Sequence, residues 1–377
     1  NKLNNAMFIS NSVQSMNPDV LKEIKRKNLP QEEMEKNKES LKSIRQEPEI
    51  IIPLPNETKQ SFFNGVNVLL DNGKNQRFAV FQCLILTNTE MANKETINKF
   101  GLKIKYKQHW NLFGWVENKF VCETERVTVA TNTMSEEEYL SCRAYAMMLD
   151  SMLRFEPIHE VFKLIEDFDV KNSVFTSALF NEMENKNNKV SECLKMFKDN
   201  LRAETHDSED EVIKYMKENE DKYKQGVLGG GNLKYSNMLW VDYFEDTLGV
   251  IFNTLKNILK EKKGSVEVVN NLEKYLRLVY FDRLNEEVPD IVSNYFDYDV
   301  LKWSKDNTNT RLQDYKNKIE YKFKKTNLSN IGTKQIWANF GFIQKKVEEK
   351  PQDNDSKEAV GYDNRFFISK LRRDITV

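Results

Sequence analysis

Cysteine is scarce in this chain of 377 residues, and its four cysteines are scattered along the sequence. They are Cys83, Cys122, Cys142 and Cys193, and the two nearest stand twenty positions apart. The sequence therefore has no group of closely spaced cysteines that could hold an iron–sulfur cluster, and no disulfide framework. Isolated thiols of this kind are typical of the reducing cytoplasm, where we expect the protein to lie.

Long apolar runs, histidines and an excess of one charge are also rare or absent. No run approaches the roughly 18 apolar residues of a membrane-spanning helix, so we expect no membrane partner. The 57 basic and 58 acidic residues give a net charge of −1, which offers no basic surface for a nucleic-acid partner. The three histidines, His109, His159 and His206, lack metal-ligand spacing, so no metal site is predicted.

Strands and helices alternate near the start of the chain. The apolar run at residues 7–9 predicts a strand that ends where polar residues follow. Asn17 and Pro18 then predict a helix start, because asparagine caps a helix well and proline fits its first position. A second helix is predicted at about 31–45, and the apolar run at 50–52 predicts a strand covered on both faces.

A third helix and a third strand continue this alternation. The helix starts near Thr58, because apolar residues between 62 and 70 repeat at helical spacing, and the apolar run at 78–86 predicts the strand. Strands that alternate with helices predict parallel pairing. Ligands of such folds lie at the carboxyl ends of the strands. The residues alone thus predict half of an α/β barrel with a polar mouth.

Three blocks of this region resemble consecutive parts of the radical S-adenosylmethionine (SAM) enzymes. They are SVQSMNPDVLKEIKRKN at 12–28, EIIIPLPNETKQSF at 49–62 and FQCLILTNTEMANKETINKFGLKIKYK at 81–107. The first two resemble the fourth and fifth strand units of that superfamily, which the oxygen-independent coproporphyrinogen oxidases share. The third resembles the sixth-strand segment of the cobalamin-associated branch. The resemblance covers about residues 5–135 and implies the C-terminal half of a partial (β/α)6 radical SAM barrel.

Three residues match family positions that contact SAM. Gln14 matches the glutamine at the SAM ribose, and Arg26 matches an arginine twelve residues later that faces the methionine moiety. Glu49 matches an acidic position at the ribose or its neighbouring hydrogen bonds, although it stands at the start of its predicted strand. Ser12 is a further candidate, because it lies two residues before Gln14 on the same face of a strand.

One departure from the family pattern concerns the turn after the second strand. The family's G-L-P-G is replaced here by Pro53, Leu54, Pro55 and Asn56. The loss of both glycines reduces the close approach of backbone to a ligand.

The resemblance also implies cofactors and a reaction. It implies SAM across the strand ends, a [4Fe–4S] cluster with ligands outside this chain, and cobalamin in a domain outside this chain. Radical SAM enzymes reductively cleave SAM to a 5′-deoxyadenosyl radical, and with cobalamin they often transfer a methyl group to a small-molecule substrate. Because the chain begins at Asn1 without a cluster motif, we expect it to be a C-terminal fragment whose partner is the upstream half of the same protein. No catalytic residue is predicted.

The pattern changes after the third strand. Residues 87–120 are interpreted as a connecting segment, and 120–130 as a strand whose apolar face is interrupted by Glu123 and Glu125. Ser135 and Glu138 form a capping-box pattern that predicts a helix start, and helical patterns dominate from about residue 134. Helices are predicted at 136–155, 158–168, 172–185, 189–203, 209–224, 237–262 and 266–284, with a strand near 319–323.

Three parts of the chain are therefore predicted. They are the C-terminal half of a radical SAM barrel with its connecting segment at 1–134, a mainly helical domain at 135–345, and a linker with a terminal docking segment at 346–377. The helical domain would then cover the barrel mouth and shape the substrate site.

Three functions remain open at this point. The chain is part of an enzyme, or a binding or scaffold protein that kept the fold without the chemistry, or a truncated, inactive product. The last follows because an open half barrel exposes strand edges and apolar surface, which favours aggregation. Two tempting sites have a simpler structural interpretation: Cys83 as a small core residue, and Trp240 with Tyr243 as core packing rather than a substrate pocket.

Overall fold

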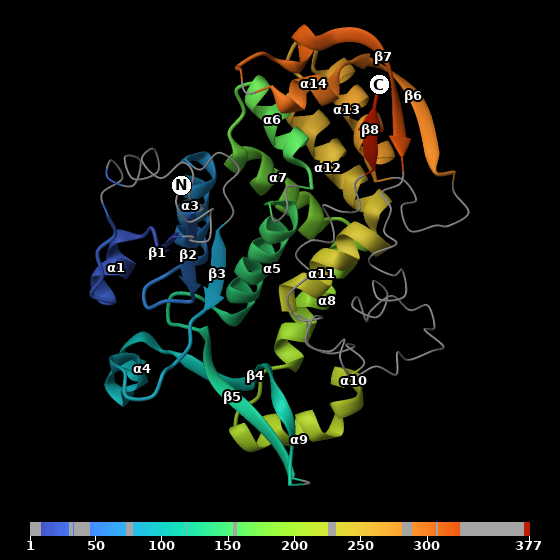
Figure 1. The fold of residues 1–377 in the computed structure, drawn as a ribbon. Helices are drawn as coiled ribbons and strands as arrows, with labels where there is room; N and C mark the ends of the chain where they lie inside the picture. Colours follow the sequence, from blue (N-terminus) through green and yellow to red (C-terminus); the bar gives the residue numbers. More distant parts are fainter. Residues whose placement is uncertain are drawn as a thin grey trace, which may run out of the picture. The chain divides into compact units, whose positions relative to one another are not determined.

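The computed structural model describes residues 9–29, 33, 46–72, 78–117, 119–153, 157–224, 231–280, 289–306, 308–324 and 373–377. The chain divides into unit 1, residues 1–150 with 195–223, and unit 2, residues 151–194 with 224–377. The fold is mixed α/β, with many helices and three small sheets (Figure 1). The described residues form no closed barrel. No described helix has the length and apolarity to cross a membrane.

The first sheet of unit 1 has three strands in the order β1-β2-β3. The strands are β1 (Ile9–Gln14), β2 (Gln46–Ile52) and β3 (Ala79–Gln82). Both neighbouring pairs are parallel, which confirms the predicted pairing. Helix α3 (Lys59–Asn72) connects β2 to β3, and such a crossover places its helix on one face of the sheet. Gly65 of α3 approaches Met16 so closely that an added Cβ would lie 3.0 Å from its Cβ.

The two faces of this sheet differ in burial. Ile50 and Ile52 are buried, and they alternate with Ile51, which is half-buried. Phe81, which pairs with Ile51 across the sheet, is 50% exposed. Successive side chains of a strand point to opposite faces, so Ile50 and Ile52 lie on the face covered by α3, while Ile51 and Phe81 lie on a face that is open.

Two strand boundaries differ from the sequence-based expectation. The predicted end of the first strand at residue 9 is wrong, because β1 continues through polar residues to Gln14; residues 7 and 8 lie outside the described part. The predicted start of the second strand at residue 50 is also wrong, because β2 begins at Gln46 and contains Pro48. Proline is tolerated there because β3 pairs with β2 only from Glu49 onward, so Pro48 pairs with β1 alone.

Helix α1 (Pro18–Glu23) follows β1 and begins as predicted. The Asn17 side chain accepts a hydrogen bond of 3.0 Å from the Asp19 backbone N–H, and Pro18 occupies the first helical position. The helix ends with Lys25 in the left-handed conformation, at φ +55°. The predicted second helix at 31–45 lies outside the described residues, apart from residue 33.

The segment expected to be a connection is instead folded. It contains the 3-10 helix η1 (Glu90–Ala92), helix α4 (Lys94–Phe100) and strand β4 (Lys103–Val116). Strand β4 forms an antiparallel hairpin with β5 (Lys119–Ala130). Ile104 and Tyr106 alternate with lysines at the start of β4, a period of two that is typical of a strand. The pairing with β5 sets its register.

Helix α9 (Glu209–Glu218) packs on this hairpin, which is why residues 195–223 belong to unit 1. Val212 and Met216 of α9 are buried in one cluster with Phe120 of β5. The backbones of Tyr106 and His206 also exchange two hydrogen bonds of 2.8 Å.

Helix α5 (Glu136–Leu153) begins at the predicted capping box. The Glu138 carboxylate accepts hydrogen bonds of 2.8 Å from the backbone N–H and the hydroxyl of Ser135, and the Glu138 N–H donates to the Ser135 hydroxyl. Two further helices lie at the end of unit 1 or across its boundary. They are α8 (Lys189–Ala203) and α10 (Glu220–Lys224).

Unit 2 is mainly helical, with one small sheet. Its helices are α6 (His159–Asp167), α7 (Asn172–Asn185), α11 (Gly231–Asn237), the π-helix η2 (Met238–Asp242), α12 (Phe244–Leu259), α13 (Ser265–Val279), α14 (Val300–Lys305) and the 3-10 helix η3 (Leu312–Tyr315). Its strands are β6 (Ile291–Tyr298), β7 (Lys316–Lys324) and β8 (Asp374–Thr376), all antiparallel. Figure 1 shows these strands in orange and red beside α13, which contacts β6.

The expected strand near 319–323 is confirmed as part of β7. Trp240 is fully buried, which confirms its interpretation as a core residue. The expected linker and most of the terminal docking segment at 346–377 lie outside the described residues. The division of the chain at residues 134 and 345 stays a prediction.

Asp167, at the end of α6, should make the stability of unit 2 depend on pH. Burial raises the pKa of its carboxyl group to about 6, although its Oδ2 accepts a hydrogen bond of 2.7 Å from the Leu312 N–H. Between about pH 4 and pH 6 the folded state therefore binds more protons at this group than the unfolded state, so the free energy of unfolding falls as pH rises.

Asp167→Asn should remove this part of the pH dependence, because asparagine stays neutral and keeps an oxygen for the Leu312 N–H. Urea unfolding of unit 2, followed at about pH 4.5 and about pH 7.5 in both proteins, measures the difference. Parallel pH profiles of the two proteins would contradict the expectation.

Candidate functional site

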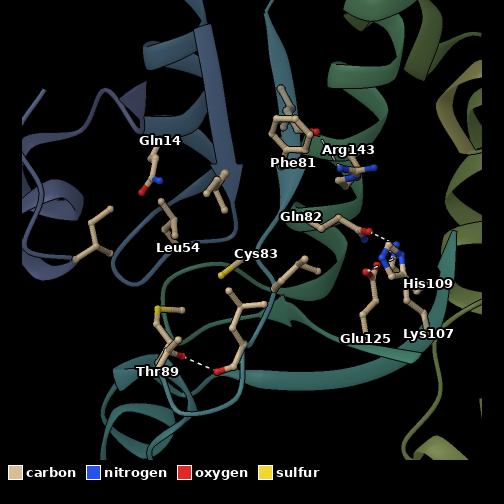
Figure 2. Close-up of a pocket in the computed structure, with 16 residues that line it drawn as sticks. Gln14, Leu54, Phe81, Gln82, Cys83, Thr89, Lys107, His109, Glu125 and Arg143 are labelled. Atoms are coloured by element: carbon tan, nitrogen blue, oxygen red, sulfur yellow. Dashed lines mark hydrogen bonds and ion pairs between the residues drawn. The ribbon is translucent and has the colours of Figure 1, made fainter. Parts of the chain in front are cut away.

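A cavity of about 780 Å³ lies on the open face of the parallel sheet in unit 1. Ile51 of β2 and Phe81 of β3 line it from this face, and Val80 and Gln82, which alternate with Phe81 along the edge strand β3, line it as well. Most of its other lining is apolar, including Leu54 after β2 and Cys83 after β3. Figure 2 shows these apolar side chains in the middle of the site, with Gln14 on one side and a polar group on the other.

The polar side of the cavity is a connected network. Lys107 of β4 donates a hydrogen bond of 2.5 Å to Gln82 Oε1, and its Nζ lies 2.9 Å from Glu125 Oε1 of β5. The Gln82 amide donates a hydrogen bond of 2.7 Å to the Tyr139 hydroxyl of α5. His109 Nδ1 lies 3.6 Å from the second oxygen of Glu125. We call Gln82, Lys107, His109, Glu125 and the nearby Arg143 the polar wall.

Three members of the polar wall are well shielded from solvent. Arg143 of α5 is only 8% exposed, and it donates a hydrogen bond of 3.3 Å to the Val80 carbonyl of β3. The Lys107 side chain is 24% exposed, and that of Glu125 is 18% exposed. Burial raises the pKa of the Tyr139 hydroxyl, and the nearby Arg143 partly offsets this shift. The network is therefore anchored in a dry part of unit 1, where polar interactions are stronger than in water.

A buried carboxyl group supports the strand ends beside the cavity. Glu57, just before α3, accepts a hydrogen bond of 2.6 Å from the Ser15 hydroxyl and another from the Ser61 hydroxyl. Its backbone carbonyl accepts one of 2.8 Å from Thr133. Burial raises the pKa of Glu57, and both hydroxyl donors act against this shift. These contacts hold the loop after β1, next to Gln14, against the loop after β2.

Gln14 is the one predicted site residue that lines the cavity. It is the last residue of β1 and has a positive φ of +58°, which few non-glycine residues adopt. This backbone conformation coincides with an irregularity in the pairing of β1 with β2 between Ser12 and Gln14. The carboxyl end of a parallel strand is where ligands of such sheets bind.

The other predicted residues do not line the cavity. Arg26 lies two residues after the C-cap of α1, where its N–H donates a hydrogen bond of 2.8 Å to the Leu21 carbonyl. Glu49 is in the middle of β2, three residues after the strand begins, so its expected place at the strand start is corrected. Ser12 pairs with Glu49 through the backbone, and its side chain lies outside the described part. Their roles as SAM contacts stay predictions.

The turn after β2 keeps a backbone conformation that suits glycine. Asn56, which stands where the family has its second glycine, has φ +64°. Asparagine adopts this left-handed conformation more readily than most other residues. The replacement of that glycine therefore leaves the local path of the chain possible.

The cysteines do not form a metal site. Cys83, Cys142 and Cys193 are buried, and burial raises the pKa of the Cys83 thiol to about 11 and that of Cys193 to about 12. Among the described residues, no group of three histidine, cysteine or acidic side chains could hold a metal ion. The residues of this chain thus do not fit a [4Fe–4S] cluster.

No residue of the polar wall was predicted as a site residue, although the sequence contains one signal for it. Glu125 interrupts the apolar face of its strand, and it pairs directly with Lys107 of β4. Because the segment with Lys107 was interpreted as a connection, this cross-strand charge pair could not be foreseen.

Comparisons with known proteins give partial matches. No family model matches the chain. Over 137 residues it is 32% identical to 2-(S-pantetheinyl)-carbapenam-3-carboxylate methyltransferase of Streptantibioticus cattleyicolor. The aligned residues make up 35% of this chain and 19% of that protein. Over 132 residues it is 29% identical to the cobalamin-dependent radical SAM methyltransferase TokK of Streptomyces tokunonensis. Here the aligned residues make up 34% of this chain and 19% of that protein.

The chain thus spans about a fifth of the length of the curated relatives it matches. The identity is low, but both matches cover about a third of this chain, and both relatives are methyltransferases. They support a relation between this chain and the radical SAM methyltransferases that depend on cobalamin.

Proposed function

We propose that this chain is part of a cobalamin-dependent radical SAM enzyme that transfers a methyl group to a small molecule. Its strands β1–β3 would form the C-terminal part of a partial (β/α)6 barrel, completed by an upstream half of the same protein. The cavity on the open sheet face is the observation that carries the proposal, because Gln14 reaches it from a strand end.

The open face of the sheet supports a barrel that needs further strands. Phe81 is 50% exposed, whereas Ile50 and Ile52 on the other face of the sheet are buried, and a large exposed apolar side chain beside a cavity is typical of a surface with a partner. In a completed barrel this face would be the interior, where the substrate would be shielded from water.

The chain fits the proposed cofactors to different degrees. Gln14 lies at the cavity and is the first candidate to bind SAM, with Arg26 and Glu49 as further candidates. When bound, SAM supplies the methyl group and the adenosyl fragment. The cluster and cobalamin would be held by other parts of the protein, because the described residues offer no cluster ligands.

Gln14→Asn should weaken the use of SAM without loss of the fold. Asparagine tolerates the positive φ of this position but shortens the side chain by one methylene group. Loss of one hydrogen bond predicts a roughly tenfold rise in the KM for SAM, with kcat largely kept. The readout is 5′-deoxyadenosine formed by the full protein, prepared without oxygen and supplied with iron, sulfide, cobalamin and a reductant.

Gln60→Asn is the matched control, because Gln60 is exposed on α3 and donates a hydrogen bond of 2.9 Å to Asn64 of the same helix. It should leave the KM for SAM unchanged. If the full protein forms no 5′-deoxyadenosine under any of these conditions, the enzyme proposal fails and a binding or scaffold protein remains.

A further inference from the structure

The polar wall has no part in the function proposed above, although it forms one side of the same cavity. Lys107 and Arg143 bring positive charge to a cavity that is otherwise mostly apolar. Charged side chains are seldom shielded this far without a role in binding or in folding. The hydrogen bonds and ion pairs of these side chains indicate which of the two roles applies.

The Lys107 ammonium group is held in place, but not all of its N–H donors have a partner among the described residues. An ammonium group has three N–H donors, and Lys107 uses two, one on Gln82 and one on Glu125. Within the described part of the chain its third donor has no partner. The Gln82 contact is in turn fixed by the buried Tyr139 hydroxyl. The ammonium group is thus positioned beforehand with one donor left, which lowers the cost of binding an acceptor.

His109 borders the same cavity. Its Nδ1 faces Glu125 at 3.6 Å, while its Nε2 has no partner among the described residues. The side chain is 52% exposed, so the imidazole lies at the rim of the cavity.

The charge of the lining is unbalanced. Lys107 and Arg143 are cations, and Glu125 is the one carboxylate among the lining residues. Among the lining residues, cationic side chains therefore outnumber carboxylates even when His109 is not counted. A carboxylate or phosphate would compensate this surplus, whereas an ammonium group would add to it.

We infer that the polar wall binds the anionic group of a substrate whose remaining body is apolar. This inference rests on the proposed function only in that the bound molecule is taken to be the substrate of the enzyme. The apolar body would lie on Ile51, Leu54 and Phe81, between the polar wall and Gln14, which Figure 2 shows on the opposite side. The atom to be methylated would then lie away from the anionic group, toward the strand end where SAM is proposed.

Binding of simple probes tests this inference without any cofactor. Octanoate, octyl phosphate, octanol and octylammonium share one apolar body and differ in charge, so calorimetric titration of the full chain isolates the effect of the head group. We expect octanoate or octyl phosphate to bind at least about tenfold more tightly than octanol, as charge-assisted hydrogen bonds predict. Octylammonium should bind more weakly than octanol. Preference between the two anions tells which anionic group the wall fits.

Two variants with opposite expected effects keep the test sharp. Lys107→Met should weaken the anion about tenfold or more and leave octanol unchanged, because methionine keeps the length without the charge. Glu125→Gln should tighten anion binding, because it removes the one carboxylate. Lys105→Met is the matched control: Lys105 lies on the same strand and pairs with Asp207, but it does not line the cavity.

Equal binding of octanoate and octanol by the unmodified chain would overturn the inference, as would an equal loss of both in Lys107→Met. This outcome is separate from the failure of the proposed function, which is measured by 5′-deoxyadenosine. An anion preference without SAM cleavage would leave the wall as a binding site and remove only the enzyme.

Discussion

Ile52→Asp is expected to lower the free energy of unfolding of unit 1 by more than about 4 kcal/mol. Ile52 is fully buried at the end of β2, on the face covered by α3. A carboxylate there would lose its water without gaining a partner, and the apolar contacts of the isoleucine would be lost as well. Typical domains are stable by only 5–15 kcal/mol, so a large fraction of the variant should be unfolded.

Hydrogen exchange in peptides from 46–72, measured by mass spectrometry, reports this loss for unit 1 separately from unit 2. Phe81→Asp is the matched comparison on the neighbouring strand, because Phe81 lies on the open face and is half exposed. Its expected cost is below about 1 kcal/mol, since the new carboxylate stays hydrated. Similar losses in both variants would mean that the two faces of the sheet are covered alike.

The comparison also bears on the proposed barrel. If upstream strands complete the sheet in the full protein, Phe81→Asp should become costly there while remaining tolerated in this chain. The contrast between the two settings would then measure the burial that such strands provide.

Trp240→Ala is expected to destabilise unit 2 by about 3–5 kcal/mol. Trp240 is fully buried within the π-helix, and its indole N–H donates a hydrogen bond of 2.9 Å to the Ser151 carbonyl. Its ring centre lies 6.2 Å from that of Tyr280. Truncation would remove these contacts, leave a cavity and leave the carbonyl without its donor.

Thermal unfolding followed by near-ultraviolet circular dichroism measures the loss, and Trp240→Phe separates its two causes. Phenylalanine keeps most of the apolar volume but lacks the N–H, so about 1–3 kcal/mol of the loss should remain. Tyr295→Ala, at a side chain that is 67% exposed, should change stability little. An unchanged melting profile of Trp240→Ala would contradict the assignment of this residue to the core.

Local signals predicted much of unit 1 and the helices of unit 2. Asn17 and Pro18 at the start of α1, and Ser135 with Glu138 at the start of α5, act within one helical turn, so their effect is visible in the sequence. Alternating strands and helices likewise predicted the parallel pairing of β1, β2 and β3. The boundaries of β1 and β2 were missed because strand length depends on the neighbouring strand, which no local pattern shows.

The candidate site divides in the same way. Gln14 was identified in the sequence, because the block around it resembles a segment of the radical SAM enzymes and the residues of that block are neighbours along the chain. The pairing of Lys107 with Glu125, and the approach of Tyr139 to Gln82, join residues 18 and 57 positions apart. Such contacts depend on the hairpin and on the placement of α5, so they could not be derived from spacing.

The amino-acid sequence alone was therefore sufficient for the class of fold, the helix starts, one cavity residue and the resemblance to radical SAM enzymes. Each of these depends on residues that are neighbours along the chain. The open face of the sheet, the cavity and the polar wall were decided by tertiary structure, because each requires side chains from separate strands and helices to meet. That is the physical reason why the charged side of the site appeared only in the folded chain.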